Sequence, residues 1–400
     1  MKMNPPIVLL GTDCLTGLQT SRILWRKGVP VIGIAADRRS PYCRTRSALQ
    51  TVPTAEIINN PRPLLLGLQE KYGARPVVLA CTDEFVWWLD DHCDAIRDCA
   101  DFLLPSSDTL QLLADKARFY RYAMEHHLPL SETRFVTHAE DLKQAACEMS
   151  FPLILKPPRR TSEWMDATGG FKVLKVDDAE TLIESGTPLL AVVDELILQA
   201  WVPGPDINTR ELSICLNNQS SLLAGIALRK IRQWPPDVGT GSLSVEMQED
   251  DVMNIGLELL QKLNYIGVGQ LEFKKNEVDS KMYLIEMNAG RVALNFPLCE
   301  ACGVEMMYTY YCAAAGLPLP ETRTVTRPGS KWICWKRDLV SAYVHWRLGD
   351  LTVREWLASL RGHKWSSDIQ LDDPIPVLAD IVRKITSRIS PKARKTLLNR

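Results

Sequence analysis

The sequence predicts an α/β domain, then an α+β domain, and then a mostly helical C-terminal extension. Three observations lead to this prediction. Short apolar runs alternate with amphipathic stretches over residues 1–105, short strand-like runs dominate residues 151–287, and five tryptophans punctuate a helical pattern after residue 330. A chain of 400 residues has room for two or three domains. We therefore expect domains at residues 1–105, 106–325 and 326–400.

The first domain is expected to be small and doubly wound. An apolar run at 7–10, a helical stretch at 21–27 and a second apolar run at 31–35 give the order strand, helix, strand. A third apolar run at 76–80 follows a helical stretch at 64–72. Right-handed crossovers would place these strands in one parallel sheet.

The loop after the first strand, residues 11–17, lacks the features of a nucleotide-binding loop. A dinucleotide fingerprint needs a second glycine where Asp13 stands, so a pyrophosphate would meet a carboxylate here. A P-loop is excluded because Leu18 and Gln19, and not Lys and Ser or Thr, follow Gly17. We expect an ordinary turn between a strand and a helix.

The second domain begins with a helix and continues with strands. A helical pattern runs from Ser107 until Pro129, with Ser106 among its candidate N-cap residues. Strand-like runs follow at 151–155, 171–176, 195–199, 212–216, 222–231, 267–273 and 283–287.

The two strand-like runs within residues 267–288 are expected to form an antiparallel hairpin. If the turn centres near residue 279, Glu272 lies opposite Glu286, and alternation places Asn288 on the same face. The other face would turn four apolar side chains toward a core: Leu271, Phe273, Ile285 and Met287. Leu284 is an exception to this alternation.

The two facing glutamates point to a divalent cation. Carboxylates that face each other repel unless a cation lies between them. Oxygen ligands from Glu272, Glu286 and Asn288 favour Mg²⁺ or Mn²⁺, and Mg²⁺ completes its shell with waters and substrate phosphates. The hairpin therefore also points to a nucleotide. The alternative that stays open is a solvated face on which water separates the two glutamates.

Lysines and a glycine pair form a candidate anion site. Lys156 ends an apolar strand and needs an anion unless its side chain reaches water. Gly169 and Gly170, followed by Lys172, make the kind of loop whose backbone N–H groups wrap phosphate oxygens. Taken alone, such a glycine pair is more often a hairpin turn. Lys116 lies in a helix, where most lysines are surface residues.

Further cations follow along the chain. Lys230 and Arg232 share a strand face by alternation, and a guanidinium can hold a carboxylate or phosphate at two points. This face is a candidate site for an acid substrate or an acyl phosphate, to which Arg291 can add a cation. The alternative is an exposed strand edge whose charges prevent pairing with other strands.

Composition excludes several classes of protein. Lys plus Arg, 47, balance Asp plus Glu, 48, so the chain has no general attraction for nucleic acid. No apolar run has the roughly 18 residues of a spanning helix or the form of a signal-peptide core, and we expect a cytoplasmic protein. Eleven scattered cysteines fit free thiols in a reducing compartment. Cys299 and Cys302 lack a second pair, which favours core thiols over a zinc site.

The end of the chain is strongly basic. Residues 383–400 contain seven Lys or Arg and no Asp or Glu, with apolar residues between them. This segment is a candidate for weak contact with an anionic membrane surface or an acidic partner. A solvated basic terminus is the alternative, because Pro391 breaks any single amphipathic helix.

Taken together, the segments resemble the ATP-grasp superfamily, in its carboxylate–amine ligase branch. The resemblance covers most of the chain and rests on LADKARFYRYAMEHHLPL (113–130), FPLILKP (151–157), TGGFK (168–172), LILQAWVPGPD (196–206), LRKIRQWPPDVGTGSL (228–243), GVGQLEFKKN (267–276) and YLIEMNAGR (283–291). It implies a degenerate Rossmann-like domain at 1–105 that precedes an ATP-grasp fold at 106–325, with a lid subdomain near 125–200.

The resemblance also implies roles for individual residues. Lys116 and Lys156 would contact the nucleotide phosphates, and Glu272, Glu286 and Asn288 would bind Mg²⁺. Adenine would lie against a hinge made of four consecutive residues: Gln199, Ala200, Trp201 and Val202.

The chain departs from the family pattern at two places. Relatives usually have a Glu before the aromatic residue of the hinge, where this chain has Gln199 and Ala200 before Trp201. After Asn288, many relatives have Pro-Arg or Gly-Arg, whereas here Arg291 follows two residues and matches only through a shift of one position. The D-aspartate ligase subgroup is similar around Asn288 and Arg291.

The activity that the resemblance implies is ATP-dependent joining of a small-molecule carboxylate to an amine through an acyl phosphate, with release of ADP and phosphate. Lys172 would join the phosphate-binding lysines, and Arg291, with Lys230 or Arg232, would hold the acid. Gly169 and Gly170 would lie on a closing lid that excludes water. A bicarbonate-using carboxylase or carbamate-forming enzyme and a non-catalytic nucleotide-binding regulator are the alternatives, and a homo-oligomer stays open.

Overall fold

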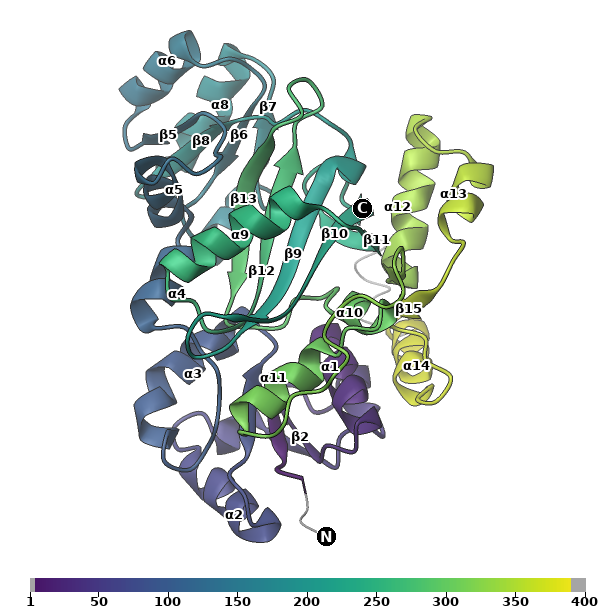
Figure 1. Ribbon diagram of the computed structural model, residues 1–400. Helices are drawn as coiled ribbons and strands as arrows, with labels where there is room; N and C mark the ends of the chain where they lie inside the picture. The colour runs from purple at the N-terminus through teal and green to yellow at the C-terminus, as the bar shows by residue number, and fades with distance from the viewer. Residues whose placement is uncertain (1–3, 390–400) are drawn as a thin grey trace.

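A computed structural model describes residues 4–389, and side chains through residue 384 (Figure 1). The chain begins with a four-stranded parallel sheet in the order β3-β2-β1-β4. The strands predicted at 7–10, 31–35 and 76–80 are present, whereas β3 was not predicted. The elements are β1 (Ile7–Leu10), α1 (Leu15–Arg26), β2 (Val31–Ala35), a 3₁₀ turn η1 (Pro41–Arg44), β3 (Gln50–Pro53), α2 (Arg62–Tyr72), β4 (Val77–Ala80) and α3 (Asp83–Ile96).

The loop between β1 and α1 is a strand–helix turn, as predicted. The Asp13 carboxylate accepts hydrogen bonds from the backbone N–H groups of Ala36 and Asp37, at 3.0 and 2.9 Å. A Cβ atom on Gly17 would lie 2.4 Å from the carbonyl oxygen of Gly11, so glycine here serves the close packing of helix on strand. The loop's own residues therefore account for its sequence without a bound phosphate.

Two short helices stand where one was expected after residue 106. Helix α4 (Ser107–Ala114) stops at Asp115, whose carboxylate accepts hydrogen bonds from the N–H groups of Ala117 and Arg118 and caps α5 (Lys116–Glu125). The break places Lys116 in the first turn of a new helix, facing the region between the two sheets that follow.

A four-stranded antiparallel sheet forms a separate layer, the lid sheet, at the upper left of Figure 1. Its strand order is β5-β8-β6-β7, and its helices lie on the side away from the rest of the molecule. The elements are β5 (Thr133–Val136), α6 (Ala139–Glu148), β6 (Leu153–Lys156), α7 (Ser162–Ala167), β7 (Leu174–Val176), α8 (Ala179–Leu189) and β8 (Leu196–Ala200).

The central sheet has seven strands in the order β13-β12-β9-β10-β11-β14-β15. Helix α9 (Asp250–Lys262) covers one of its faces (Figure 1), and Leu259, Leu271 and Phe273 belong to the core between them. The strands up to the hairpin are β9 (Thr209–Leu216), β10 (Leu222–Trp234), β11 (Thr240–Glu246), β12 (Gly267–Lys275) and β13 (Met282–Ala289), and α10 (Pro297–Ala301) and α11 (Met306–Ala314) follow.

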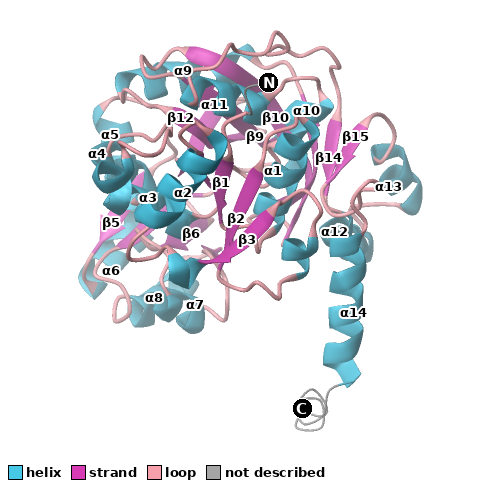
Figure 2. Cartoon of the chain, turned by 90° about the horizontal axis from the view of Figure 1, so that it is seen from below, coloured by secondary structure: helices cyan, strands magenta, loops and turns pink. Residues whose placement is uncertain are grey.

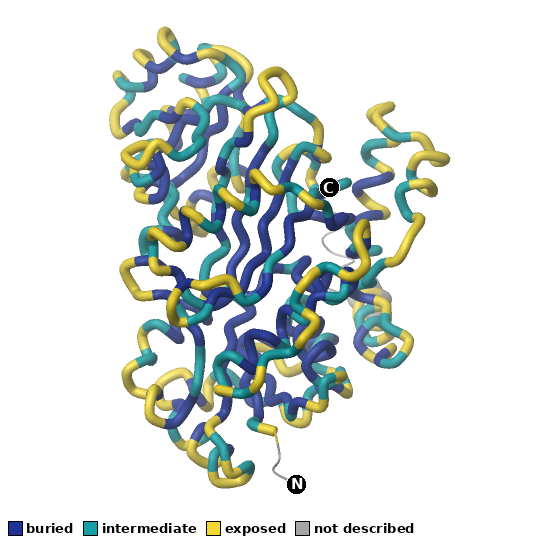
Figure 3. The backbone as a smooth tube through the Cα atoms, in the orientation of Figure 1, coloured by how far each residue is buried: buried dark blue, intermediate teal, exposed yellow. Residues whose placement is uncertain are grey.

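The C-terminal extension contains strands as well as the predicted helices. Strand β14 (Lys331–Ile333) pairs antiparallel with β11, and β15 (Lys364–Ser366) pairs parallel with β14, so the extension completes the central sheet. Its helices are α12 (Trp335–Leu348), α13 (Val353–Ser359) and α14 (Ile375–Ile389). Residues 390–400, most of the predicted basic tail, lie outside the described residues. Figure 3 shows the buried backbone concentrated in the central and N-terminal sheets.

Candidate active site

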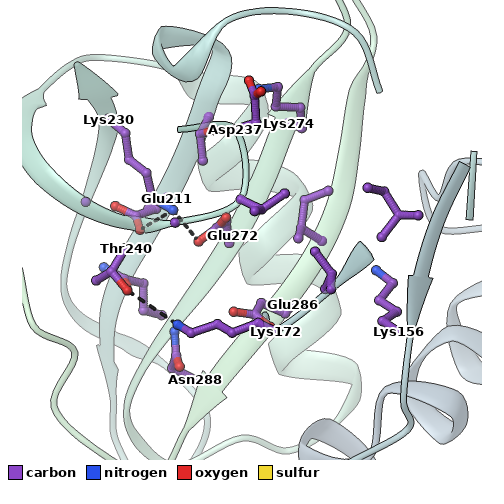
Figure 4. A pocket seen from close by; sticks show the side chains of 18 of the residues that line it. Lys156, Lys172, Glu211, Lys230, Asp237, Thr240, Glu272, Lys274, Glu286 and Asn288 are labelled. Carbon is purple, nitrogen blue, oxygen red and sulfur yellow. Dashed lines mark hydrogen bonds and ion pairs between the residues drawn. The ribbon is translucent and has the colours of Figure 1, made fainter. Parts of the chain in front are cut away.

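A cavity of about 280 Å³ lies between the lid sheet and the central sheet. Strands β6 and β8 supply residues from the lid side, and β9 to β13 supply residues from the opposite side. Figure 4 shows charged side chains from both sides converging on it. Its lining includes twelve residues predicted from the sequence: Lys116, Lys156, Lys172, Gln199, Ala200, Trp201, Val202, Lys230, Glu272, Glu286, Asn288 and Arg291.

The predicted hairpin register is confirmed. Glu272 pairs with Glu286 across β12 and β13, and Gln270 pairs with Asn288. All four side chains line the cavity.

A β-bulge next to Glu272 corrects the predicted apolar face. The register shifts by one residue there, so that Phe273 pairs with Leu284. Leu284 is therefore buried in the core, and Ile285, predicted to face the core, lines the cavity instead. The bulge explains why Leu284 was an exception to strict alternation.

Each of the two glutamates meets a different lysine. Lys116 Nζ lies 3.2 Å from Glu286 Oε2, and its charge lowers the pKa of Glu286 to about 2. Lys230 Nζ lies 2.8 Å from Glu272 Oε2. Burial alone would lower the pKa of Lys230, but the charges of Glu272 and Glu211 raise it above its ordinary value. Both glutamates therefore have cationic partners from outside the hairpin.

Glu211 is a site residue that the sequence analysis missed. It pairs with Glu272 across β9 and β12, is 4% exposed, and accepts a 2.6 Å hydrogen bond from Asn295 Nδ2. Burial raises its pKa to about 7, against the opposing effect of Lys230, whose Nζ lies 3.6 Å away. The only sequence signal was a charged pair, Arg210 and Glu211, at the start of an apolar strand.

The donor set of the hairpin suits a hard divalent cation. Glu286 stays deprotonated at neutral pH because its pKa is low, as a metal ligand must be. Asn288 Oδ1 accepts a 2.6 Å hydrogen bond from Arg291 and keeps a second lone pair. Two carboxylates and one amide oxygen are ligands of the kind that Mg²⁺ takes. No cluster of three His, Cys, Asp or Glu side chains suited to a metal occurs within the described residues.

Lys156 is buried without an anionic partner in contact. The residue is only 4% exposed, and its ammonium donates hydrogen bonds to Tyr120 Oη and to Gln199 Oε1, both at 2.6 Å. Burial, with a smaller effect of Lys116, lowers its pKa to about 7. Gln199 in turn donates to Thr133 Oγ1 at 3.0 Å. The uncharged Gln199 therefore supplies the acceptor for the Lys156 ammonium at this strand.

Trp201 lies between two lysines at the hinge. Lys175 Nζ and Lys274 Nζ are 5.1 and 5.9 Å from the centre of the indole ring. Lys274 also donates to the carbonyl oxygen of Pro205 at 3.0 Å. Cation–π contacts of this kind help to hold the indole ring in place at the cavity.

Comparison with known proteins finds a match over the part of the chain that contains the hairpin. The family model described as carbamoyl-phosphate synthase L chain, ATP binding domain, matches residues 243–322, which include β12 and β13. A curated D-alanine–D-alanine ligase from Acinetobacter baumannii is 31% identical over 139 residues, which are 34% of this chain and 39% of that protein. The chain thus matches well under half the length of this relative.

Solved structures match far more of the chain. N5-carboxyaminoimidazole synthetase from Staphylococcus aureus, complexed with ADP, covers 81% of each chain at 15% identity and a TM-score of 0.61. The chain has the fold of the ATP-grasp superfamily. The biotin carboxylase domain of Hydrogenobacter thermophilus 2-oxoglutarate carboxylase, complexed with MgADP, ADP and bicarbonate, covers 81% of this chain and 72% of that one, at 16% identity and a TM-score of 0.61.

Arg232 lies outside the ATP-grasp cavity, contrary to the prediction. The register between β10 and β11 shifts on both sides of Arg232, which breaks the alternation that would have aligned it with Lys230. Its guanidinium instead makes two 2.9 Å hydrogen bonds to the buried carboxylate of Asp338 on α12. Lys230 lines the cavity, whereas Arg232 joins the ATP-grasp sheet to the C-terminal extension.

Gly169 and Gly170 are not among the residues that line the cavity. They follow α7, where the N–H of Gly170 donates to the carbonyl of Met165 at 2.7 Å, and both residues have positive φ. They therefore cap a helix and do not form the hairpin turn that was considered. Lys172, just beyond them, does reach the cavity and lies 3.4 Å from Thr240 Oγ1.

Two further predictions concern Arg291 and the cysteine pair. Arg291 lines the cavity and pairs with Asp83 of α3, so it connects the N-terminal domain to the cavity. Cys299 and Cys302 are free, fully buried thiols, as predicted.

Proposed function

We propose that the protein is an ATP-dependent ligase that joins a small carboxylic acid to an amine through an acyl phosphate. The observation that carries the proposal is the facing pair of Glu272 and Glu286, which shares one cavity with seven Lys and Arg residues: Lys116, Lys156, Arg160, Lys172, Lys230, Lys274 and Arg291. Acids that could hold a metal and cations that could hold phosphates are the two components that phosphoryl transfer from ATP requires.

The phosphates of ATP would bind between the lid and the hairpin. Lys156 and Lys172 approach from the lid side, and Lys116 from α5. Burial lowers the pKa of both Lys156 and Lys172, and a phosphate would supply the anion that each ammonium lacks. The solved relatives with ADP and MgADP support ATP as the nucleotide.

Glu272, Glu286 and Asn288 would hold Mg²⁺ or Mn²⁺. When bound, such an ion would neutralise the charge that develops on the phosphates during transfer. Lys116 and Lys230, which pair with these glutamates in the structure, would then be freed to contact phosphate oxygens.

The acid would bind beyond the glutamates, near Arg291 and Lys230. One oxygen of its carboxylate attacks the γ-phosphorus of ATP, the bond to the bridging oxygen breaks, and ADP leaves. The amine then attacks the acyl carbon and loses a proton, and phosphate leaves with the attacking oxygen. Arg291 and Lys230 would reduce the repulsion between the anionic acid and ATP, because each lines the cavity beside the hairpin.

The name of the curated relative, D-alanine–D-alanine ligase, favours an amine as the second substrate over bicarbonate. The test is ADP formation with Mg-ATP across pools of amino acids, dipeptides and other carboxylates, followed by mass analysis. We expect turnover that needs both an acid and an amine, and a product one water lighter than the two together. ADP formation driven by bicarbonate would replace the proposal with a carboxylase, and tight ATP binding without turnover in any pool would replace it with a regulator.

A further inference from the structure

The C-terminal extension exposes an unusual concentration of apolar side chains. Of the 21 large apolar residues that are exposed in the described part of the chain, 13 lie between Leu339 and Val382, and only eight precede residue 339. Soluble domains rarely expose contiguous apolar surface without a binding partner. This surface lies far along the chain from the residues of the ATP-grasp cavity.

The exposed residues follow helical spacing. Helix α12 exposes Leu339, Tyr343 and Trp346, which lie four and three residues apart, at 52–54% exposure. Helix α14 exposes Ile375, Leu378 and Val382, which lie three and four residues apart. Each helix therefore has one apolar face directed away from the protein.

The inner faces of the same helices are held by ion pairs to the body of the protein and to each other. Asp338 on α12 is buried against Arg232, and Lys336 pairs with Asp380 on α14. Just before α14, Asp373 lies 2.8 Å from Arg22 in a pair that is 1% exposed. The extension is thus anchored on its inner side.

In both Figure 1 and Figure 2, α12, α13 and α14 lie together at one side of the molecule, and α14 projects beyond it in Figure 2. We call the exposed apolar residues of 339–382 the C-terminal apolar surface.

The charge of this region differs from that of the rest. Residues 326–400 contain 15 Lys and Arg against seven Asp and Glu, although the whole chain has a net charge of -1. Residues 1–325 are correspondingly acidic. Seven of the 15 cations fall within 383–400, where no acid is present. A basic segment thus follows directly on the exposed apolar face of α14.

We propose that the C-terminal apolar surface binds the interface of an anionic lipid bilayer. Apolar faces with neighbouring Lys and Arg are the features by which amphipathic helices bind such interfaces, where Tyr343 and Trp346 would lie at headgroup level. None of the helices that the structure describes has the length and apolar character needed to span a bilayer. The contact is therefore peripheral.

A second copy of the chain fits this surface less well. Pairing two copies through α14 would bring the basic segments at 383–400 close together, and like charges repel. An anionic bilayer supplies the opposite charge over the whole region.

The experiment is flotation of the full-length protein with vesicles of phosphatidylcholine, with and without phosphatidylglycerol. We expect binding to the vesicles with phosphatidylglycerol and weaker binding at high salt, because salt screens the basic segment. The variant Leu378→Glu combined with Ile381→Glu should bind at least about tenfold more weakly, since charge replaces the inserted face. Leu66→Glu, on an exposed residue of α2, is the matched control and should bind normally.

Both altered sites are exposed, so each variant should keep its unfolding temperature and its ATP-dependent activity. Equal binding to vesicles with and without phosphatidylglycerol, or none to either, would overturn the proposal. A dimer in light scattering that Leu378→Glu dissociates would overturn it as well, in favour of a second copy. Because the readout is vesicle binding, its failure would leave the proposed ligase activity untouched.

Discussion

Glu272 and Glu286 lie directly opposite each other in β12 and β13, yet they are paired with cations from different parts of the molecule. Lys230 reaches Glu272 from β10 of the same sheet, and Lys116 reaches Glu286 from the first turn of α5. We infer that the two lysines stabilise the acidic pair before a metal ion and nucleotide bind. Binding would exchange these ion pairs for metal–carboxylate and lysine–phosphate contacts.

Replacing Glu286 tests the role of the hairpin. Glu286→Gln removes one charge from the acidic pair while keeping its shape, and we expect turnover to fall by at least about a hundredfold, a typical loss when a group that stabilises transition-state charge is removed. Glu277→Gln, on an exposed glutamate in the turn of the same hairpin, is the matched control and should retain activity. Circular dichroism melting should be unchanged in both. Full activity of Glu286→Gln would remove the hairpin from the site.

The lowered pKa of Lys156 predicts that the protein takes up a proton when it binds nucleotide. Its pKa is lowered to about 7 by burial, so at about pH 8 most of the free protein has neutral Lys156. A bound phosphate would raise this pKa, and the ammonium would then regain its proton. Calorimetry of ATP-analogue binding at about pH 8, in buffers of different ionisation enthalpy, should therefore show uptake that disappears near pH 6.

The variant Lys156→Met tests whether Lys156 is the group that takes up the proton. Proton uptake near pH 8 should vanish in this variant, and binding should become less dependent on pH. Equal uptake in the variant and the original protein would assign the titration to another group, such as Glu211, whose pKa is also about 7.

The Arg232–Asp338 pair predicts a purely structural effect. Arg232→Met leaves the carboxylate of Asp338 buried without its main cation, and we expect a loss of about 3 kcal/mol in the free energy of unfolding by urea. Activity per folded molecule should be retained because Arg232 does not line the cavity. Arg354→Met, on an exposed arginine of α13, should change stability by less than about 0.5 kcal/mol. A selective loss of kcat in Arg232→Met would restore the catalytic role predicted from the sequence.

The bulge between β12 and β13 predicts that substitutions at two neighbouring residues differ: one should mainly lower stability, and the other should mainly weaken ATP binding. Leu284→Ala opens a cavity in the core and should lower the free energy of unfolding by about 2–4 kcal/mol. Ile285→Ala should cost less stability but raise the KM for ATP, because Ile285 lines the cavity. Urea unfolding and steady-state kinetics on both variants distinguish them. The reverse pattern would mean that strict alternation continues through the hairpin.

Much of the site followed from local sequence patterns. The pairing of Glu272 with Glu286 could be predicted because the turn residues fix the register and alternation fixes the face. Lys156 could be recognised because a charged residue at the end of a buried strand needs a partner. These inferences need only residues that are close in sequence.

The failures have physical reasons. Bulges moved Arg232 and Ile285 to the opposite faces from those predicted, and a bulge adds one residue without a clear sequence signal. Glu211 was missed because its significance depends on Lys230 and Asn295, which the fold brings to it from other strands. Gly169 and Gly170 were predicted to wrap phosphate oxygens, and their place after a helix was missed because α7 was not predicted.

The most direct test of the acyl-phosphate account is oxygen transfer from the acid substrate. Once the acid and amine are known, the reaction is run with the acid carboxylate labelled with oxygen-18, and the released phosphate is analysed by mass spectrometry. The account predicts one labelled oxygen in each phosphate, because the carboxylate oxygen that attacks the γ-phosphorus leaves with it. Unlabelled phosphate from a reaction that still forms the amide would contradict activation of the acid by direct phosphorylation.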